Sequence, residues 1–343
     1  MKRFWKSALP ALGMLLLILA PQMAVSCARE ALELCLKSVV PSLFPFFVLS
    51  SLLSGSIIGI QNRATSLLGR LCFLPPGTES ILLIGLLGGY PTGAQVTAQA
   101  FRDGAISKDQ AGRMLGFCSN AGPAFLFGIC GSLFPAGWMA WLLWGIHAIS
   151  AVLTARSLEK VDYQPKILPA GAEISLPTAL DRSLRNMARV CGWVILFRLL
   201  TGFLEHWLMG LPDIISVLIS GMLELTNGCL MLDNVASIGL RFYLCSLFLA
   251  FGGLCVTMQT VSVAGDLGIG HYLHGKLLQT SVSGLLSLAV VILFHPGARK
   301  TEDFLAFALL VVHLFAYILL KRKKTVAIRK EMMYNQEKQE SWT

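Results

Sequence analysis

Helix-breaking and polar residues interrupt the apolar runs of this chain at two places close together. Residues 85–123 read GLLGGYPTGAQVTAQAFRDGAISKDQAGRMLGFCSNAGP, with glycine and proline where an uninterrupted membrane helix would carry leucine or valine. Proline removes a backbone donor and disfavours helix in the preceding residue, so we expect helix breaks beside Pro91 and Pro123. Freed backbone groups at membrane depth need protein or water around them, which is typical of the binding region of a transporter.

Two further interruptions lie in the C-terminal half of the chain. One is ELTNG at residues 224–228, and the other is the glycine pair 252–253 within AFGGLCVTMQ. Gln95 lies seven residues after Gly88 of the first glycine pair, and Gln259 lies seven residues after Gly252 of the second pair. An asparagine also occurs at a break in each half of the chain. Because transporters commonly pair broken helices between repeats, this echo favours an internal repeat with a duplicated site.

The residues at these breaks suit the carboxylates of a small organic anion. Half-helix N-termini and freed backbone N–H groups present positive potential, and glycine lets a ligand approach the backbone closely. Side-chain amides and hydroxyls add neutral donors, which allow both selection and release. We therefore expect substrate contacts from Gly88, Gly89, Tyr90, Thr92, Gln95, Ser119, Asn120, Gly122, Thr226, Asn227 and Gln259.

Two charged residues inside apolar runs, Glu224 and Arg198, are further candidates. An ionisable residue inside a membrane costs at least about 2.5–3.5 kcal/mol on insertion scales and is a functional candidate by default. Glu224 is expected to carry a coupling proton or bind a cation, with a structural pairing as the alternative. Arg198 is expected to clamp a substrate carboxylate. The alternatives for Arg198 are a pair with Glu205 or a position at the interface.

Other kinds of chemistry have no matching motif. We find no Gly-x-x-x-x-Gly-Lys phosphate loop, no His-Glu-x-x-His and no nucleophile–base pair, so neither ATP binding nor enzymatic activity is expected. The nine cysteines include no Cys-x-x-Cys pair and are expected to be small buried hydrophobic residues. No metal or cofactor is expected. His147 and His313 lie on apolar faces and are interpreted as packing residues.

Composition places the chain in a bilayer. Of its 343 residues, 55% are apolar and 14% are charged, against about 25% charged residues in soluble domains. The formal net charge of +9 is concentrated near residues 2–6, 156–189 and 321–324, beside apolar runs. This pattern follows the positive-inside rule, so the expected partner is the lipid bilayer and not nucleic acid, with both termini cytoplasmic.

We predict an all-α, polytopic membrane protein with about eight transmembrane helices and two broken or re-entrant hairpins. The parts are a first transmembrane helix with an amphipathic interface segment (1–38), a transport core (39–298), and a last transmembrane helix with a basic cytoplasmic tail (299–343). The predicted spans are 7–26, 39–60, 114–134, 138–158, 190–208, 212–232, 277–294 and 304–320, and the predicted hairpins are 79–100 and 241–264.

Charge decides between two topologies. If both hairpins dip in and return, the basic connection 159–189 lies on the cytoplasmic side with the termini; if all ten segments cross, it lies outside. Charge favours the first arrangement, although an inverted repeat would bring the hairpins in from opposite faces.

The interruptions also carry a family resemblance. The motifs GGYPTGAQ, FCSNAGP, LELTNG and AFGGLCVTMQ are similar to those of the YlbJ family, which comprises sporulation integral membrane proteins with a nucleoside-recognition Gate domain. The resemblance covers roughly residues 32–294. It implies a fold related to nucleoside transporters. It also implies movement of dipicolinate, a pyridine dicarboxylate, from mother cell to forespore through the outer forespore membrane.

Two other functions stay open at this stage. The chain is alternatively a structural or assembly protein of spore formation, in which the broken helices matter only for folding. It is alternatively a nucleoside or nucleobase transporter, as the domain name suggests. Homo-oligomerisation is also open.

Overall fold

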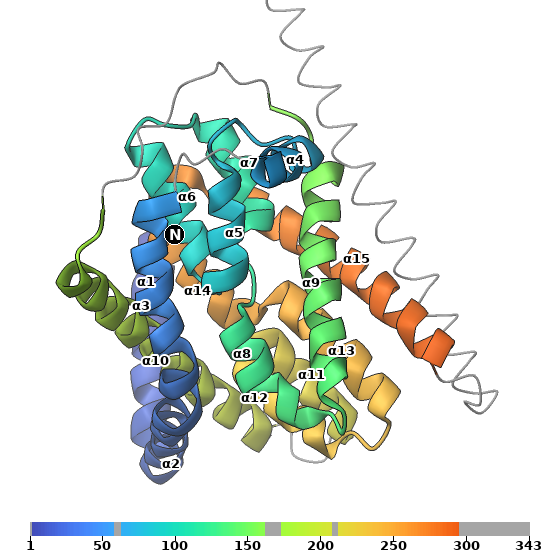
Figure 1. Ribbon diagram of the computed structural model, residues 1–343. Coiled ribbons are helices and arrows are strands. Elements are labelled where there is room, and N and C mark those ends of the chain that lie inside the picture. The colour runs from blue at the N-terminus through green and yellow to red at the C-terminus, as the bar shows by residue number, and fades with distance from the viewer. Residues whose placement is uncertain (1, 58–62, 162–172, 208–211, 295–343) are drawn as a thin grey trace, which may run out of the picture.

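The computed structural model describes residues 2–57, 63–161, 173–207 and 212–294, and these are helical with no strand among them (Figure 1). The all-α expectation is confirmed. The last predicted span, 304–320, and the basic tail lie outside the described residues. The α-helices are α1 (Lys2–Leu19), α2 (Pro21–Leu34), α3 (Val40–Ile57), α4 (Arg63–Cys72), α5 (Glu79–Gly88), α6 (Thr92–Arg102), α7 (Lys108–Cys118), α8 (Pro123–Gly128), α9 (Gly137–Ser157), α10 (Leu176–Trp207), α11 (Asp213–Leu223), α12 (Leu225–Met231), α13 (Ile238–Phe251), α14 (Gly253–Ala264) and α15 (Gly270–Phe294).

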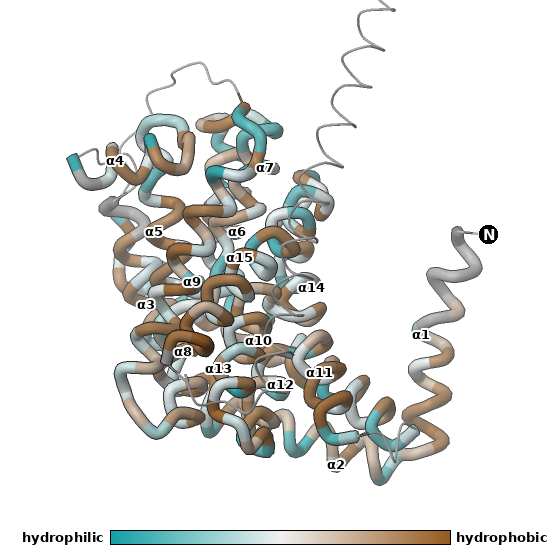
Figure 2. Tube along the Cα trace, turned by 90° about the vertical axis from the view of Figure 1, so that its right-hand side faces the viewer, coloured by the Kyte–Doolittle hydropathy of each residue, from teal (hydrophilic) through white to brown (hydrophobic). Residues whose placement is uncertain are grey.

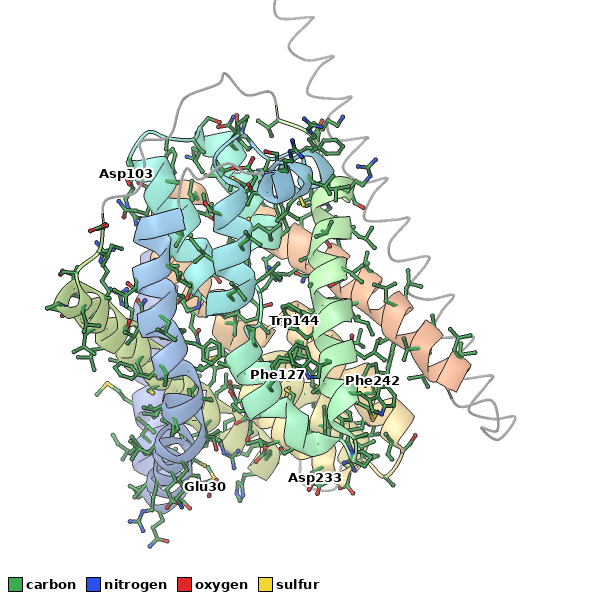
Figure 3. The ribbon with its side chains drawn as sticks, viewed as in Figure 1. Glu30, Asp103, Phe127, Trp144, Asp233 and Phe242 are labelled. Atoms are coloured by element: carbon green, nitrogen blue, oxygen red, sulfur yellow. The ribbon has the colours of Figure 1, made fainter. Side chains whose placement is uncertain are left out.

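Within the described residues, five segments are long and apolar enough to cross a membrane: Pro21–Leu53, Gly137–Ser157, Leu176–Trp207, Ile238–Leu267 and Gly270–Leu293. The chain is therefore polytopic, as predicted. Hydrophilic residues gather near α4 and α7 at the end of the bundle that is uppermost in the figures, which we call the upper end (Figure 2). Asp103 lies at this end, and Glu30 and Asp233 lie at the lower end (Figure 3).

The first predicted span, 7–26, is not one helix. α1 ends at Leu19 and α2 begins at Pro21, the residue at which a kink is expected. α1 stands away from the bundle and joins it through α2 (Figure 2).

The predicted interface segment 29–37 is part of a long helix. α2 continues through a π-helical turn, η1 (Cys35–Val39), into α3, so the helix passes residue 38 without a break. Its amphipathic pattern does not reflect a position at the membrane interface. The apolar face of the helix packs against α10 instead. The packed face is a stripe at helical spacing, formed by Ala24, Cys27, Ala31, Cys35, Val39, Leu43 and Phe47.

The first predicted hairpin is present. α5 runs inward from the upper end, the chain turns at Gly89–Pro91, and α6 returns to the same end (Figure 1). The carbonyl of Cys118 fits between the two arms, since a methyl group at Gly85 or Gly93 would lie 1.7 or 1.8 Å from that oxygen. Only glycine permits this approach.

The predicted location of the second hairpin, 241–264, is wrong. These residues belong to α13 and α14, which form one broken crossing within the 30-residue segment Ile238–Leu267. The hairpin is instead α11–α12, at residues predicted to span. Its arms pack closely because a methyl group at Gly228 would lie 2.1 Å from the Cα of Gly221.

The order of elements occurs twice. A long helical segment, a hairpin, a broken crossing and a second long helix follow one another as α2–α3, α5–α6, α7–α8 and α9, and again as α10, α11–α12, α13–α14 and α15. Packing follows the same scheme: α7 contacts α15 and α13 contacts α9, while α8 contacts α3 and α14 contacts α10. The hairpins enter from opposite ends (Figure 1), which is the arrangement of an inverted repeat. The arrangement that charge favours, with residues 79–100 and 241–264 both dipping in and returning, is therefore not present, because the second hairpin is α11–α12.

One of the predicted connections also differs. The polar connection 159–189 is helical from Leu176, where α10 begins. Ser107 is the N-cap of α7, as predicted, and forms a capping box with Gln110.

A buried arginine holds the upper end together. The Arg113 guanidinium on α7 donates to the backbone carbonyls of Cys72 at 2.8 Å, Phe73 at 3.2 Å, Ala155 at 2.6 Å and Glu159 at 2.7 Å. It thereby satisfies carbonyls at the C-terminal ends of α4 and α9.

Candidate functional site

The four helix interruptions meet around one cavity. Its volume is about 40 Å³. Each interruption contributes to the wall: the turn after α5, the turn before α8, the break between α11 and α12, and α14 after Gly252. The lining residues are Val39, Leu43, Gly89, Tyr90, Ala121, Gly122, Phe125, Val190, Val194, Glu224, Leu225, Thr226, Val256 and Gln259.

The cavity has an apolar side and a polar side. Val39, Leu43, Val190 and Val194 come from the first long helical segment and from α10, which are equivalent in the two repeats. The polar side carries the predicted residues Gly89, Tyr90, Gly122, Glu224, Thr226 and Gln259. The lining offers apolar contact for a ring together with hydrogen-bonding groups.

Glu224 is the N-cap of α12 and lines the cavity. Its carboxylate accepts from the backbone N–H of Thr226 at 3.0 Å and of Asn227 at 2.6 Å. A carboxylate at a helix N-terminus is stabilised by the N–H groups and the helix dipole there. The structural pairing expected as an alternative for Glu224 is therefore present, and the same carboxylate remains part of the cavity wall.

Asn120 lies behind the cavity wall in a network of side chains. Its amide nitrogen donates to the carbonyl of Phe117 at 2.7 Å, and its oxygen accepts from Gln279 of α15 at 2.8 Å. The amide–carbonyl bond closes the end of α7, and the second bond attaches the break to α15. Asn120 thus shapes the break from behind.

A buried lysine, Lys276 of α15, completes this network. Its Nζ donates to the Tyr90 hydroxyl at 3.0 Å and to Gln279 Oε1 at 2.7 Å, and it also donates to the backbone carbonyl of Ser119. Nζ also lies 4.9 Å from the centre of the Tyr90 ring. The side chain is 0% exposed. Lys276 therefore connects the first hairpin, the α7–α8 break and α15.

His147 of α9 satisfies another freed backbone group. Its Nε2 accepts from the backbone N–H of Ala121 at 3.1 Å. The expectation of a hydrogen-bonded packing residue is confirmed for His147, whereas His313 lies outside the described residues.

Several predicted site residues do not line the cavity. Gly88 ends α5, Thr92 bonds the Gly88 carbonyl at 3.2 Å, and Gln95 accepts from Asn186 of α10 at 2.9 Å. Ser119 is fully buried, with its carbonyl on Lys276. Asn227 uses its backbone N–H to bind Glu224.

Arg198 is also outside the cavity lining. It pairs with Glu205 at 3.0 Å, as the alternative for this residue predicts, and with Glu30 of α2 at 2.7 Å. It links α10 to α2 through Glu30, which lies at the lower end of the bundle (Figure 3).

Sequence reasoning missed Lys276 and Gln279. The predicted span 277–294 begins one residue after the lysine and contains Gln279. A signal was available, because Lys276, Gln279 and Ser283 share one helical face within an apolar run.

All nine cysteines are free, and eight are buried. The Sγ atoms of Cys130, Cys229 and Cys245 lie within 4.8 Å of one another. Three thiols at this separation match the donor set of a soft metal ion. Their surroundings, however, are apolar side chains of the main core, where thiolate charges have no compensating partner.

The sequence was compared with known proteins. No protein-family model matches it, and no solved structure does. It is 26% identical to the sporulation integral membrane protein YlbJ of Bacillus subtilis (strain 168), in an alignment that covers 82% of this chain and 80% of the relative. This similarity supports the resemblance to YlbJ, and the apolar helices make the chain a polytopic integral membrane protein similar to that relative.

Proposed function

We propose that this protein is a membrane carrier for a small organic anion, with dipicolinate as its substrate. By its similarity to a sporulation protein, we assign it to sporulation and to the outer forespore membrane. In this proposal the chain has no catalytic role, and substrate passes through the region where the two repeats meet.

One observation carries the proposal: all four interrupted helices contribute to the same cavity. Interrupted helices place unpaired N–H groups and helix ends in the membrane, and such groups are stable only around a cavity or inside protein. Midplane sites at a repeat interface are typical of secondary transporters. The apolar part of the lining suits the pyridine ring, and the donors in the lining suit carboxylates.

In the described conformation the cavity is narrow. A cavity of about 40 Å³ has room for about three water molecules. Substrate binding therefore requires the walls to separate. The two repeats supply the parts that move, because each contributes one hairpin and one broken crossing to the cavity.

Glu224 is the proposed coupling residue. An ionised carboxylate in the cavity repels a dianion, so proton or cation binding at Glu224 favours substrate binding. The two events are then linked thermodynamically, since each ligand raises the affinity for the other.

Charge supports a cytoplasmic upper end. Basic residues at the lower end include Arg29 and Arg198 beside Glu30, Lys37, and Arg241 beside Asp233, whereas α4, α7 and their neighbours at the upper end carry Arg63, Arg70, Arg102, Lys108, Arg113, Arg156 and Lys160. Under the positive-inside rule, this distribution puts the α5–α6 hairpin on the cytoplasmic side.

Uptake into proteoliposomes tests the proposal. We expect saturable uptake of dipicolinate by the purified full-length protein. Val190→Phe narrows the cavity from its apolar side and is expected to lower uptake at least about tenfold. Leu196→Phe is the matched control, because Leu196 lies on the same helix with 55% of its surface exposed.

The same assay separates the rival functions. Competition by nucleosides, with no dipicolinate uptake, would identify a nucleoside transporter. Absence of flux for every substrate under proton, sodium and counterflow conditions would overturn the carrier proposal in favour of an assembly protein.

A further inference from the structure

Lys276 is a buried basic side chain with no carboxylate partner among the described residues. The ion pairs of the described residues involve Lys37, Arg185, Arg198 and Arg241, and none reaches Lys276. Its hydrogen-bond acceptors are a phenol, a side-chain amide and a backbone carbonyl, all of them neutral. Burying an ammonium group with only neutral acceptors is costly, so such residues mark ion or substrate pathways.

Tyr90 separates this lysine from the cavity. The tyrosine is part of the cavity wall, while its hydroxyl accepts from Lys276 and donates to the carbonyl of Leu249 at 3.1 Å. Lys276 itself does not line the cavity. Tyr90 is therefore the cavity-lining side chain that contacts the lysine.

A second unused donor lies beside the lysine. The hydroxyl of Ser119 is fully buried and has no hydrogen-bond partner among the described residues. The carbonyl of the same residue accepts from Lys276. Ser119 belongs to the α7–α8 break. Two later residues of the same break, Ala121 and Gly122, line the cavity. An anion at Lys276 would thus find a charged donor and a neutral donor together.

We propose that Lys276 binds one carboxylate of the transported anion, with Tyr90 as the gate that covers it when substrate is absent. On binding, the carboxylate replaces the Tyr90 hydroxyl as an acceptor of the ammonium N–H groups, and Ser119 donates to its second oxygen. This assignment rests on the proposed carrier function and adds the residue that distinguishes an anion from a neutral molecule.

Binding measurements on the detergent-purified full chain test the lysine. Lys276→Met is expected to weaken dipicolinate binding about a hundredfold, as removal of one partner of a buried charge pair does. Lys276→Arg retains the charge and is expected to bind more tightly than Lys276→Met. Lys108→Met, at an exposed lysine at the start of α7, is the control for loss of one positive charge. Monodisperse Lys276→Met protein that binds dipicolinate as tightly as its parent would overturn the assignment.

A second experiment does not depend on dipicolinate. Tyr90→Ala removes the proposed gate, so we expect chloride to leak from proteoliposomes that hold this variant. The double variant Tyr90→Ala/Lys276→Met is expected to lose the leak, because the cation that attracts chloride is gone.

The two experiments fail in different ways. A parent protein that transports no dicarboxylate defeats the carrier proposal, whereas the chloride test still judges Lys276 as an anion site. An equal chloride leak in Tyr90→Ala and in the double variant would show that Lys276 attracts no anion, and would overturn the inference.

Discussion

Gly116 of α7 and Gly275 of α15 lie in contact at the point where the two helices cross. A methyl group at Gly275 would lie 2.2 Å from the carbonyl oxygen of Gly116. The next residue after Gly275 is Lys276, and three residues after Gly116 comes Ser119, the lysine's carbonyl partner. The close crossing therefore sets the position of the lysine against the α7–α8 break. Small residues at helix crossings are the usual means of such approach in membranes.

We expect Gly275→Ala to separate α7 from α15 and destabilise the protein. Overpacking of this kind costs about 1–3 kcal/mol, and more where backbone is in the way, as it is here. Thermal unfolding in detergent measures the effect. Gly270→Ala is the control on the same helix, since no atom lies within 4 Å of a methyl group there. Equal melting temperatures for both variants would contradict the close crossing.

Arg113→Lys is expected to loosen the upper end of the bundle. Lysine has one nitrogen and cannot reach the four carbonyls that the guanidinium satisfies. Losing two charged hydrogen bonds costs about 3 kcal/mol. Limited proteolysis and thermal unfolding report the change. Arg102→Lys, at an exposed arginine that bonds Gln99 at 2.9 Å, should melt with the parent protein.

The interruptions could be predicted because their cause is local. Pro91, Pro123 and the glycine pair 252–253 break helices through their own backbone properties, whatever surrounds them. The breaks at all of these positions are present. The all-α, polytopic class followed in the same way from apolar runs that are read directly from the chain.

The second hairpin and Lys276 depend on contacts between distant residues. An apolar segment with a break in the middle has the same pattern whether it crosses or turns back. The packing of Gly221 against Gly228 and the cap by Glu224 decide the outcome. Likewise, Lys276 is buried because α15 crosses α7 beside it; the polar face of Lys276, Gln279 and Ser283 is visible in the sequence, but the helix that it meets is not.

Asn120→Ala is expected to affect stability more than Asn227→Ala. The first change leaves the Phe117 carbonyl and the Gln279 amide without their bonds, at a cost of about 1–3 kcal/mol. The second leaves the backbone bond to Glu224 intact. Melting temperatures in detergent compare the two variants. A larger loss for Asn227→Ala would show that its side chain does more than the described contacts indicate.

Arg198→Gln is expected to leave substrate affinity unchanged. Arg198 lies outside the cavity lining and is paired with Glu30 and Glu205, so its removal affects the contact between α2 and α10. Because these carboxylates are partly exposed, the loss of stability should be small. Dipicolinate binding by the variant checks this, and a large loss of affinity would restore Arg198 to the site.

Glu224→Gln separates the two roles of this carboxylate. Glutamine has one acceptor oxygen and so keeps one of the two bonds to Thr226 and Asn227, which lowers stability by about 1 kcal/mol. If Glu224 also binds the coupling ion, gradient-driven accumulation of substrate falls while counterflow exchange continues, because exchange requires no net ion movement. Asp213→Asn, at an exposed carboxylate in the first turn of α11, is the matched control. Undiminished accumulation by a destabilised Glu224→Gln protein would limit Glu224 to its role as a helix cap.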